Sequence, residues 1–314
     1  MTGHFLKRIL FFWLALCTAG AVPCAAGREP DAPDIRRSIL AGSWYPGSRE
    51  ALARAVRGYL SLAGTTRLNG TLKGIIVPHA GYRYSGLVAA HAFRLLRGKH
   101  FRRVVLVGPS HRMAFKGISV NLQSAYETPL GRVRVDRAFG KRLVASAPGI
   151  RWLRQAHARE HSLEIELPFL QSVLDDFRIV PIVMGQQDLE TCTVLAKALA
   201  RLLGDETGTL LLASSDLSHY HTYDRAMTLD RRFIRHVAEF DPPGLFRDLL
   251  RGRCEACGGG PVIAVLMAAR EAGADRAVIL AHANSGDVTG DRERVVGYMS
   301  AALIRASGTD PRPK

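Results

Sequence analysis

The sequence predicts an α/β protein with one domain, in which a central, mostly parallel sheet is flanked by helices. Three observations lead to this fold class. Short apolar runs alternate with segments of helical periodicity from about residue 40 to residue 305, which is typical of parallel strands joined by helices. The apolar runs are rich in Val, Ile and Leu, as in strands that are buried on both faces. No internal repeat or linker marks a second domain.

The individual elements follow from these patterns. The apolar runs predict strands at Leu72 to Val77, Val104 to Val107, Ile179 to Val183, Thr209 to Ala213, Ala277 to Ala281 and Val295 to Leu303. Helical spacing predicts helices at Glu50 to Leu60, Gly86 to Leu96, Ser162 to Leu174, Leu189 to Leu203, Arg225 to Glu239, Leu245 to Leu250 and Pro261 to Ala272. Ser162 and Asp241 are start signals for two of the helices. Pro129 and Gly131 separate two β-like pieces within residues 117–135, which predicts a hairpin.

The N-terminus has the layout of a secretory signal. Lys7 and Arg8 precede an apolar run that is too short to span a bilayer, and small residues follow it. We therefore expect residues 1–26 to be a signal peptide and the protein to be exported, to a periplasm or to the extracellular space. Pro23 disfavours lipid attachment at Cys24. The folded domain is predicted over residues 39–305, with a flexible tail at residues 306–314.

The formal net charge is +15 at pH 7. The basic residues are scattered, without long runs of like charge or interleaved aromatic residues, so we expect no specific nucleic acid partner. Weak association with an anionic membrane surface remains open. Beyond the signal region three cysteines remain, Cys192, Cys254 and Cys257, and this odd number does not form a disulfide framework.

Metal-capable side chains follow three of the predicted strands. His79 and His111 each come shortly after a strand, and Asp216 and His219 follow a third. In open α/β sheets ligands bind at the carboxyl ends of the strands, so these side chains predict a site there. Cys257 precedes a predicted helix, where a thiolate is favoured. Imidazole and thiolate ligands suit several transition metals, and the sequence does not choose among them.

Six motifs make the chain resemble a known family. They are Ala41-Gly42-Ser43-Trp44-Tyr45-Pro46, Pro78-His79-Ala80-Gly81-Tyr82, Gly108-Pro109-Ser110-His111, Glu160-His161-Ser162-Leu163-Glu164, Ser214-Ser215-Asp216-Leu217-Ser218-His219 and Ala256-Cys257-Gly258. In this order they resemble the Memo family, also called AmmeMemoRadiSam system protein B. The resemblance extends from about Ile39 to Leu303.

The resemblance implies a fold similar to that of the class III extradiol (LigB-like) dioxygenases. It implies one iron or copper ion, with zinc less favoured, held by His79, His111 and Cys257. Asp216 and His219 would be pocket residues that either bind the metal or act beside it. We take Asp216, His219, Glu160 and His161 as the candidate catalytic residues, and we expect Glu160 and His161 to line the pocket or begin a helix. Metal-dependent redox chemistry is the usual proposal for the family, and its name suggests a radical SAM protein as a partner. Ring-cleaving activity does not follow from the fold.

Two alternatives to a redox protein remain open. One is a protein that binds a peptide or another small ligand on the same fold without turnover. The other is a zinc metallopeptidase, because His157-Ala158-Arg159-Glu160-His161 matches the H-x-x-E-H pattern of inverted zinc peptidases. This five-residue match is easily met by chance. No predicted strand is followed by the G-x-S-x-G motif of serine hydrolases, by a Walker loop or by a G-x-G-x-x-G motif.

Overall fold

The computed structural model describes residues 34–204 and 206–307. The predicted signal peptide at residues 1–26 lies outside these residues, as do residues 308–314 of the predicted tail. The prediction of export therefore continues to depend on the sequence pattern alone. Within the described ranges, no helix combines the length and the apolar character that a membrane span needs.

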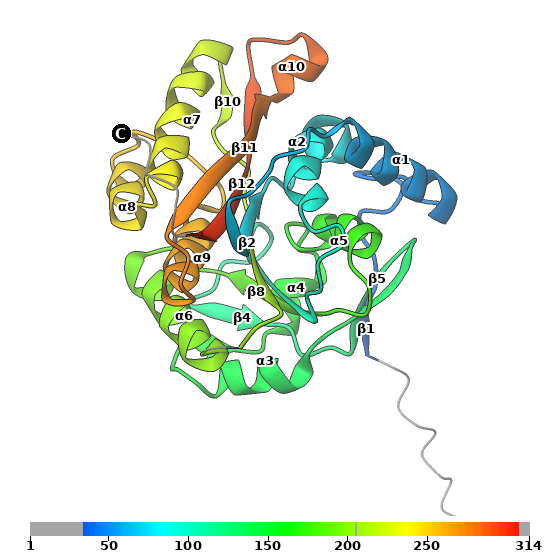
Figure 1. The fold of residues 1–314 in the computed structure, drawn as a ribbon, viewed down its shortest axis with the longest axis vertical. Coiled ribbons are helices and arrows are strands. Elements are labelled where there is room, and N and C mark those ends of the chain that lie inside the picture. Colours follow the sequence, from blue (N-terminus) through cyan, green and yellow to red (C-terminus); the bar gives the residue numbers. More distant parts are fainter. Residues whose placement is uncertain (1–33, 205, 308–314) are drawn as a thin grey trace, which may run out of the picture. The chain divides into compact units, whose positions relative to one another are not determined.

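A nine-stranded mixed sheet forms the centre of the described fold (Figure 1). Its middle strands are parallel, in the order β2 (Gly70–Val77), β9 (Thr209–Ser214), β3 (Arg103–Pro109) and β8 (Arg178–Met184). Beyond β2 lie the antiparallel strands β12 (Val295–Ala306), β11 (Arg276–Asn284) and β10 (His219–His221). Beyond β8 lie β4 (Ile118–Val120), which is antiparallel to it, and β7 (Ile150–Arg151). The six predicted strands are all present, and the antiparallel edges make the sheet mixed.

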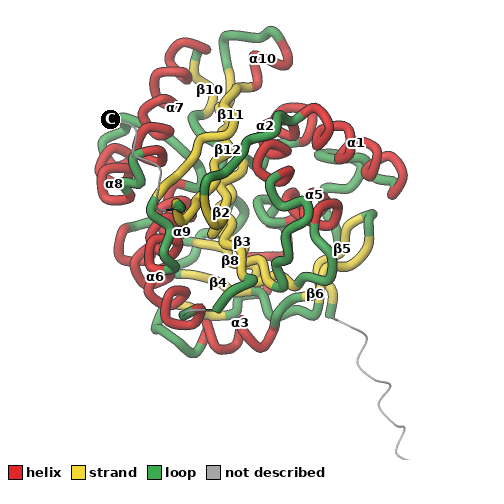
Figure 2. The backbone as a smooth tube through the Cα atoms, in the orientation of Figure 1, coloured by secondary structure: helices red, strands yellow, loops and turns green. Residues whose placement is uncertain are grey.

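Helices cover both faces of this sheet (Figures 1 and 2). One face packs against α1 (Arg49–Leu62), α2 (Tyr82–Arg94) and α5 (Leu167–Val173). The other packs against α3 (Arg137–Val144), α6 (Leu189–Leu203), α7 (Tyr223–Ala238), α8 (Pro242–Leu250) and α9 (Gly259–Glu271). Within β2, Ile75 and Val77 join the first core and Ile76 joins the second. Alternate side chains point to opposite faces of a strand, so burial on both faces requires an unbroken apolar run.

The helix that was predicted to start at Ser162 begins later. A short 3-10 helix, η1 (Glu164–Glu166), precedes α5 at Leu167. Ser162 does not cap either of them, because its backbone N–H donates to the Glu160 side chain and its hydroxyl donates to the Pro109 carbonyl oxygen. Tertiary contacts therefore replace the local cap that the sequence suggested.

A separate three-stranded sheet contains the predicted hairpin. β5 (Ala125–Thr128) and β6 (Gly131–Arg134) are antiparallel, with Pro129 in the turn between them. The third strand is β1 (Ile35–Arg36), which lies before the predicted domain start at residue 39 and pairs with β5. The remaining helices are α4 (Arg154–Ala158) and α10 (Ser285–Thr289).

Candidate metal centre

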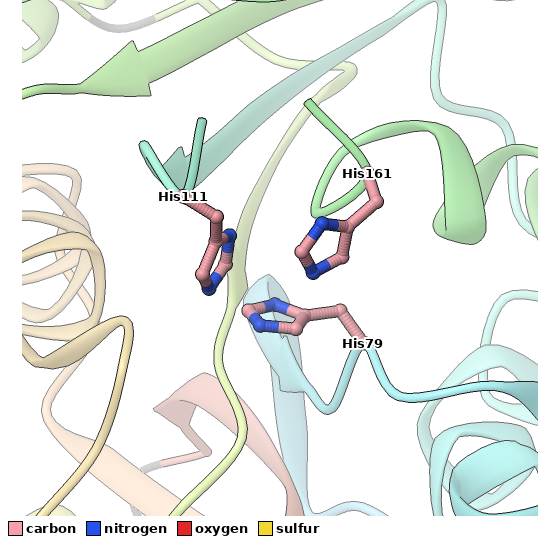
Figure 3. Close-up of side chains that lie close together, drawn as sticks. All are labelled: His79, His111 and His161. Carbon is pink, nitrogen blue, oxygen red and sulfur yellow. The ribbon is translucent and has the colours of Figure 1, made fainter. Parts of the chain in front are cut away.

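Three imidazole rings converge at the carboxyl end of the parallel strands. His79 follows β2, His111 follows β3, and His161 lies in the loop before η1. Figure 3 shows the rings turned toward one another. One nitrogen from each ring lies within 4.8 Å of the nitrogens offered by the other two. The structure thus brings the two predicted histidines together and adds His161, which was predicted to line the pocket and not to bind metal.

Hydrogen bonds fix the ring of His79 and the turn that carries it. Asp216 Oδ1 accepts the backbone N–H groups of His79, at 2.8 Å, and of Ala80, at 3.2 Å. The His79 Nδ1 atom lies 2.7 Å from the Ser214 hydroxyl oxygen. Because Nδ1 is engaged in this way, Nε2 is the nitrogen of His79 that remains for a ligand.

A single carboxylate organises the other two histidines. Glu160 Oε2 accepts the backbone N–H of His111 at 2.6 Å, and Oε1 lies 2.9 Å from His111 Nδ1. Oε1 also accepts the backbone N–H groups of His161 and Ser162, each at 2.9 Å. Burial raises the pKa of Glu160, but these hydrogen bonds and the charge of His111 outweigh it and hold the pKa at about 2. Carboxylates in this position orient metal-binding histidines.

His161 has a buried ring nitrogen without a hydrogen-bond partner. Its Nδ1 atom is 3.5 Å from Glu160 Oε1, and no hydrogen bond reaches it in the described residues. Its ring stacks on that of His111, with centroids 4.3 Å apart, and the Trp44 ring lies 4.5 Å away on a tilted plane. Buried polar atoms are rarely left unpaired. With Nδ1 beside the Glu160 carboxylate, Nε2 is the nitrogen of His161 that remains for a ligand.

The surroundings keep the rings of His79 and His161 neutral. Burial, followed by the charge of His111, lowers the pKa of His79 well below its usual value. Burial, followed by the charge of His79, lowers the pKa of His161 to about 3. Neutral imidazole is the form that binds metal, so the donor set is chemically suited to a transition-metal ion.

Cys257 lies beside His79. Its Sγ atom is 3.1 Å from His79 Nε2, so the structure brings the third predicted ligand into the same centre. The predicted preference for thiolate does not hold for the free thiol, because burial and the charge of Asp216 raise the pKa of Cys257. Helix α9 starts only at Gly259. Cys254 and Cys257 are both free, so no disulfide joins them in this structure.

Gly258, the residue after Cys257, allows Cys257 to lie close to His79. A Cβ atom there would lie 2.5 Å from the Ser214 carbonyl oxygen and 2.7 Å from the Ser215 Cβ. Only glycine lets the segment that carries Cys257 pack directly against the end of β9.

Asp216 and His219, which follow the same predicted strand, have different surroundings. Asp216 is buried against the backbone of His79, and its Oδ2 atom lies 4.0 Å from His79 Nε2. Burial raises the pKa of Asp216 to about 6, although hydrogen bonds from the His79 and Ala80 backbone lower it. The Nδ1 atom of His219 lies 2.8 Å from the Leu217 carbonyl oxygen. Because that oxygen only accepts, Nδ1 is protonated and donates.

A cavity of about 480 Å³ adjoins the centre on the Cys257 side. Its walls are mostly apolar, and His219 and Cys257 both line it. The other lining residues are Gln187, Leu217, Phe246, Leu249, Leu250, Cys254, Glu255, Ala256, Gly259 and Gly260. No lysine or arginine of the described ranges lines this cavity, although the chain has a formal net charge of +15. Its size is in the usual range for a small-molecule site.

The peptidase-like motif does not form a metal site on one helix. Helix α4 ends at Ala158, so His157 and His161 do not share a helix. The two ring nitrogens of His157 lie 3.0 Å from the Ser119 hydroxyl oxygen and 3.2 Å from the Tyr126 hydroxyl oxygen. His157 is therefore a buried structural residue, and the zinc-peptidase alternative loses one of its two histidines.

This burial of His157 predicts a pH-dependent stability. Burial, followed by the charge of Arg36, lowers the pKa of His157 to about 3 from the ordinary value of 6.5. The unfolded chain therefore binds a proton that the folded chain excludes, and stability is lost as the pH falls from 6.5 toward 3. In urea unfolding between pH 4 and pH 6, His157→Gln should reduce the slope of stability against pH by about 1.4 kcal/mol per unit.

Contributions from all other groups are common to both proteins and cancel in this comparison. His100→Gln is the matched control, because His100 is exposed, and it should retain the wild-type slope. Equal slopes for His157→Gln and the wild type would contradict the prediction.

Comparisons with known proteins identify the family of the chain. The family model described as Memo-like protein matches residues 36–302. A MEMO1 family protein of Methanothermobacter thermautotrophicus is 39% identical over 276 residues, which cover 84% of this chain and 98% of the relative. A MEMO1 family protein of Methanopyrus kandleri is 35% identical, with 86% of this chain and 99% of the relative covered.

A solved structure is similar in fold. It is an uncharacterized protein of Escherichia coli K12, which aligns with a TM-score of 0.52 at 15% sequence identity and covers 74% of this chain and 99% of its own. At this identity the likeness concerns the fold alone. The family match over most of the chain and the two relatives above 30% identity lead to one conclusion: the chain belongs to the Memo-like protein family.

Proposed function

We propose that this protein binds one iron or copper ion and performs metal-dependent redox chemistry on a small molecule. The observation that supports the proposal most is the convergence of His79, His111 and His161, whose ligand nitrogens lie within 4.8 Å of one another. An oxygen atom lies beside the Nδ1 atom of each ring, at 2.7 Å, 2.9 Å and 3.5 Å, which leaves the three Nε2 atoms for an ion.

These three histidines would hold the ion, with Cys257 available as a further ligand. Iron and copper both accept imidazole and thiolate. The preference for a redox metal over zinc comes from the resemblance to the Memo family. When bound, the ion would supply electron transfer to oxygen or to a substrate.

The chain's own residues would position the reactants. Glu160 holds the His111 ring and the backbone of His161, so the donor set is rigid before an ion binds. Asp216 lies 4.0 Å from His79 Nε2 and, with a pKa of about 6, can take or release a proton near neutral pH. The cavity beside Cys257 would seat the substrate. Its mostly apolar walls favour a largely apolar compound, and His219, Gln187 and Glu255 offer polar contacts.

The proposal is tested by redox turnover of the full chain. Protein loaded with Fe(II) or Cu(II), and freed of unbound metal by desalting, is expected to consume oxygen when ascorbate is supplied. The chelator-stripped protein and a His79→Ala/His111→Ala variant carried through the same loading should not. A chain that holds one metal per molecule and consumes no oxygen would instead support the alternative of a binding protein without turnover.

A further inference from the structure

Glu166 is a buried acidic residue that the proposed chemistry does not use. It lies at the end of η1 and is 1% exposed. Its Oε1 atom is 3.0 Å from the Ser214 hydroxyl oxygen. The same hydroxyl lies 2.7 Å from His79 Nδ1 and 2.6 Å from the Ser162 carbonyl oxygen. Three polar atoms therefore share one serine hydroxyl directly behind a candidate metal ligand.

Counting protons assigns the direction of each hydrogen bond. A serine hydroxyl donates one hydrogen bond and accepts two. The Ser162 carbonyl oxygen has no proton, so at 2.6 Å the Ser214 hydroxyl must donate to it. The hydroxyl oxygen then accepts from both of its other neighbours. His79 Nδ1 must be protonated, and the Glu166 carboxyl must donate, which it does only when it is protonated as well.

Every other assignment leaves acceptors in contact without a proton. If Ser214 donated to an ionised Glu166, its lone pairs would face the Ser162 carbonyl oxygen at 2.6 Å. If it donated to His79 Nδ1, the same contact with the carbonyl would remain. A buried acceptor without a donor has lost its hydrogen bonds to water, and no new hydrogen bond offsets that loss.

The environment of Glu166 independently favours the protonated acid. Burial raises the pKa of Glu166 well above its ordinary value, and the charge of Asp216 raises it further, against the effect of the Ser214 hydrogen bond. None of these neighbours is a cation. The thiol of Cys257 agrees with the same arrangement, because an unprotonated Nε2 of His79 can accept its S–H over the observed 3.1 Å.

We propose that Glu166 is a positioning residue, which as a neutral carboxylic acid donates to Ser214 and thereby fixes His79 as the tautomer with its proton on Nδ1. Nε2 is then left free for a ligand. This chain of hydrogen bonds selects the nitrogen of His79 before any metal arrives. Its role toward a metal ion depends on the proposed function, whereas the tautomer itself does not.

The first test is the tautomer of His79 in the metal-free full chain. ¹⁵N-histidine NMR at pH 7, with the His79 signal assigned through a His79→Gln variant, should show the proton on Nδ1. Glu166→Gln should retain this tautomer, because its amide N–H can donate to Ser214 as the protonated acid does. Glu166→Leu cannot donate and should populate both tautomers. A wild-type ring protonated on Nε2 would overturn the proposal, whether or not the protein binds metal.

The second test separates the hydrogen bond from the charge of Glu166. With Co²⁺ as a spectroscopic probe, Glu166→Gln should bind within about threefold of the wild type, and Glu166→Leu about tenfold or more weakly. Equal losses in the two variants would show that an ionised Glu166 is needed, and would overturn the proposal. Absence of Co²⁺ binding by the wild type would count against the proposed function and leave the tautomer result standing.

The third test is the pH dependence of stability, which reports the protonation of Glu166 without any metal. Because the folded pKa of Glu166 lies above its unfolded value, the wild type loses stability as the pH rises from about 4.5. Relative to Glu166→Gln, its unfolding constant should increase about tenfold per pH unit between pH 5 and pH 7. A constant ratio over this range would mean that Glu166 is already ionised in the folded chain, which contradicts the proposal.

Discussion

A variant with both His79 and His111 replaced by alanine is expected to retain no stoichiometric iron or copper after dialysis. The substitutions remove two of the three imidazoles whose nitrogens lie within 4.8 Å of one another. Loss of an outer hydrogen-bond partner of a ligand costs about 10–100-fold in metal affinity. Loss of two direct ligands should exceed that range. Metal content by mass spectrometry of the dialysed protein, with circular dichroism to verify the fold, measures the effect.

Two further variants resolve the composition of the donor set. His161→Ala should weaken metal binding about as much as His111→Ala, if His161 is the third ligand. Cys257→Ser tests whether the thiol is also a ligand. His100→Ala is the matched control, since His100 is an exposed histidine outside the centre, and it should bind metal as the wild type does. Full metal content in the His79→Ala/His111→Ala variant would refute the assignment of these two histidines as metal ligands.

Glu164→Ala is expected to destabilise the fold by about 3–5 kcal/mol, the usual cost of removing one partner of a buried ion pair. The carboxylate of Glu164 forms a buried ion pair with Arg36. It also accepts the Tyr45 hydroxyl at 2.6 Å and the backbone N–H groups of Ile39 and Leu40 at 3.0 Å. Removal of this side chain leaves one charge and several donors buried without partners.

Urea unfolding at pH 7 measures this loss. Glu127→Ala is the control, because Glu127 pairs with Arg37 at the surface, and exposed pairs contribute little. Replacing both Arg36 with Met and Glu164 with Leu should cost less than Glu164→Ala alone, since no charge remains unpaired. If the Glu164→Ala protein were as stable as the Glu127→Ala control, the packing of residues 35–45 would not depend on the Glu164 carboxylate.

The same network explains how the N-terminal segment reaches the metal centre. Arg36 donates to the carbonyl oxygens of His157 and Glu160, so it holds the loop that carries His161. Trp44, eight residues later, places its ring against His161. Loss of Glu164 should therefore weaken metal binding as well as stability.

The fold class and the place of the site could be predicted from the amino-acid pattern alone. Strands such as β2 and β3 need apolar side chains on both faces, and this local requirement is visible as an unbroken run. Parallel strands present their carboxyl ends at one edge, so the positions of His79 and His111 directly after two such strands predict that they lie together. The motif that contains Cys257 added a further candidate.

The side chains that complete the centre, and their protonation states, depend on contacts between segments that are distant in the sequence. His161 lies in no strand, and the H-x-x-E-H match gave it a competing interpretation that the end of α4 at Ala158 removes. Glu160 contacts His111 across 49 residues of sequence, and such a contact leaves no periodic signal. The raised pKa of the Cys257 thiol and the protonation of Glu166 depend on burial and on neighbours from other elements. Local sequence encodes secondary structure, whereas desolvation and hydrogen bonding between distant segments exist only once the chain has folded.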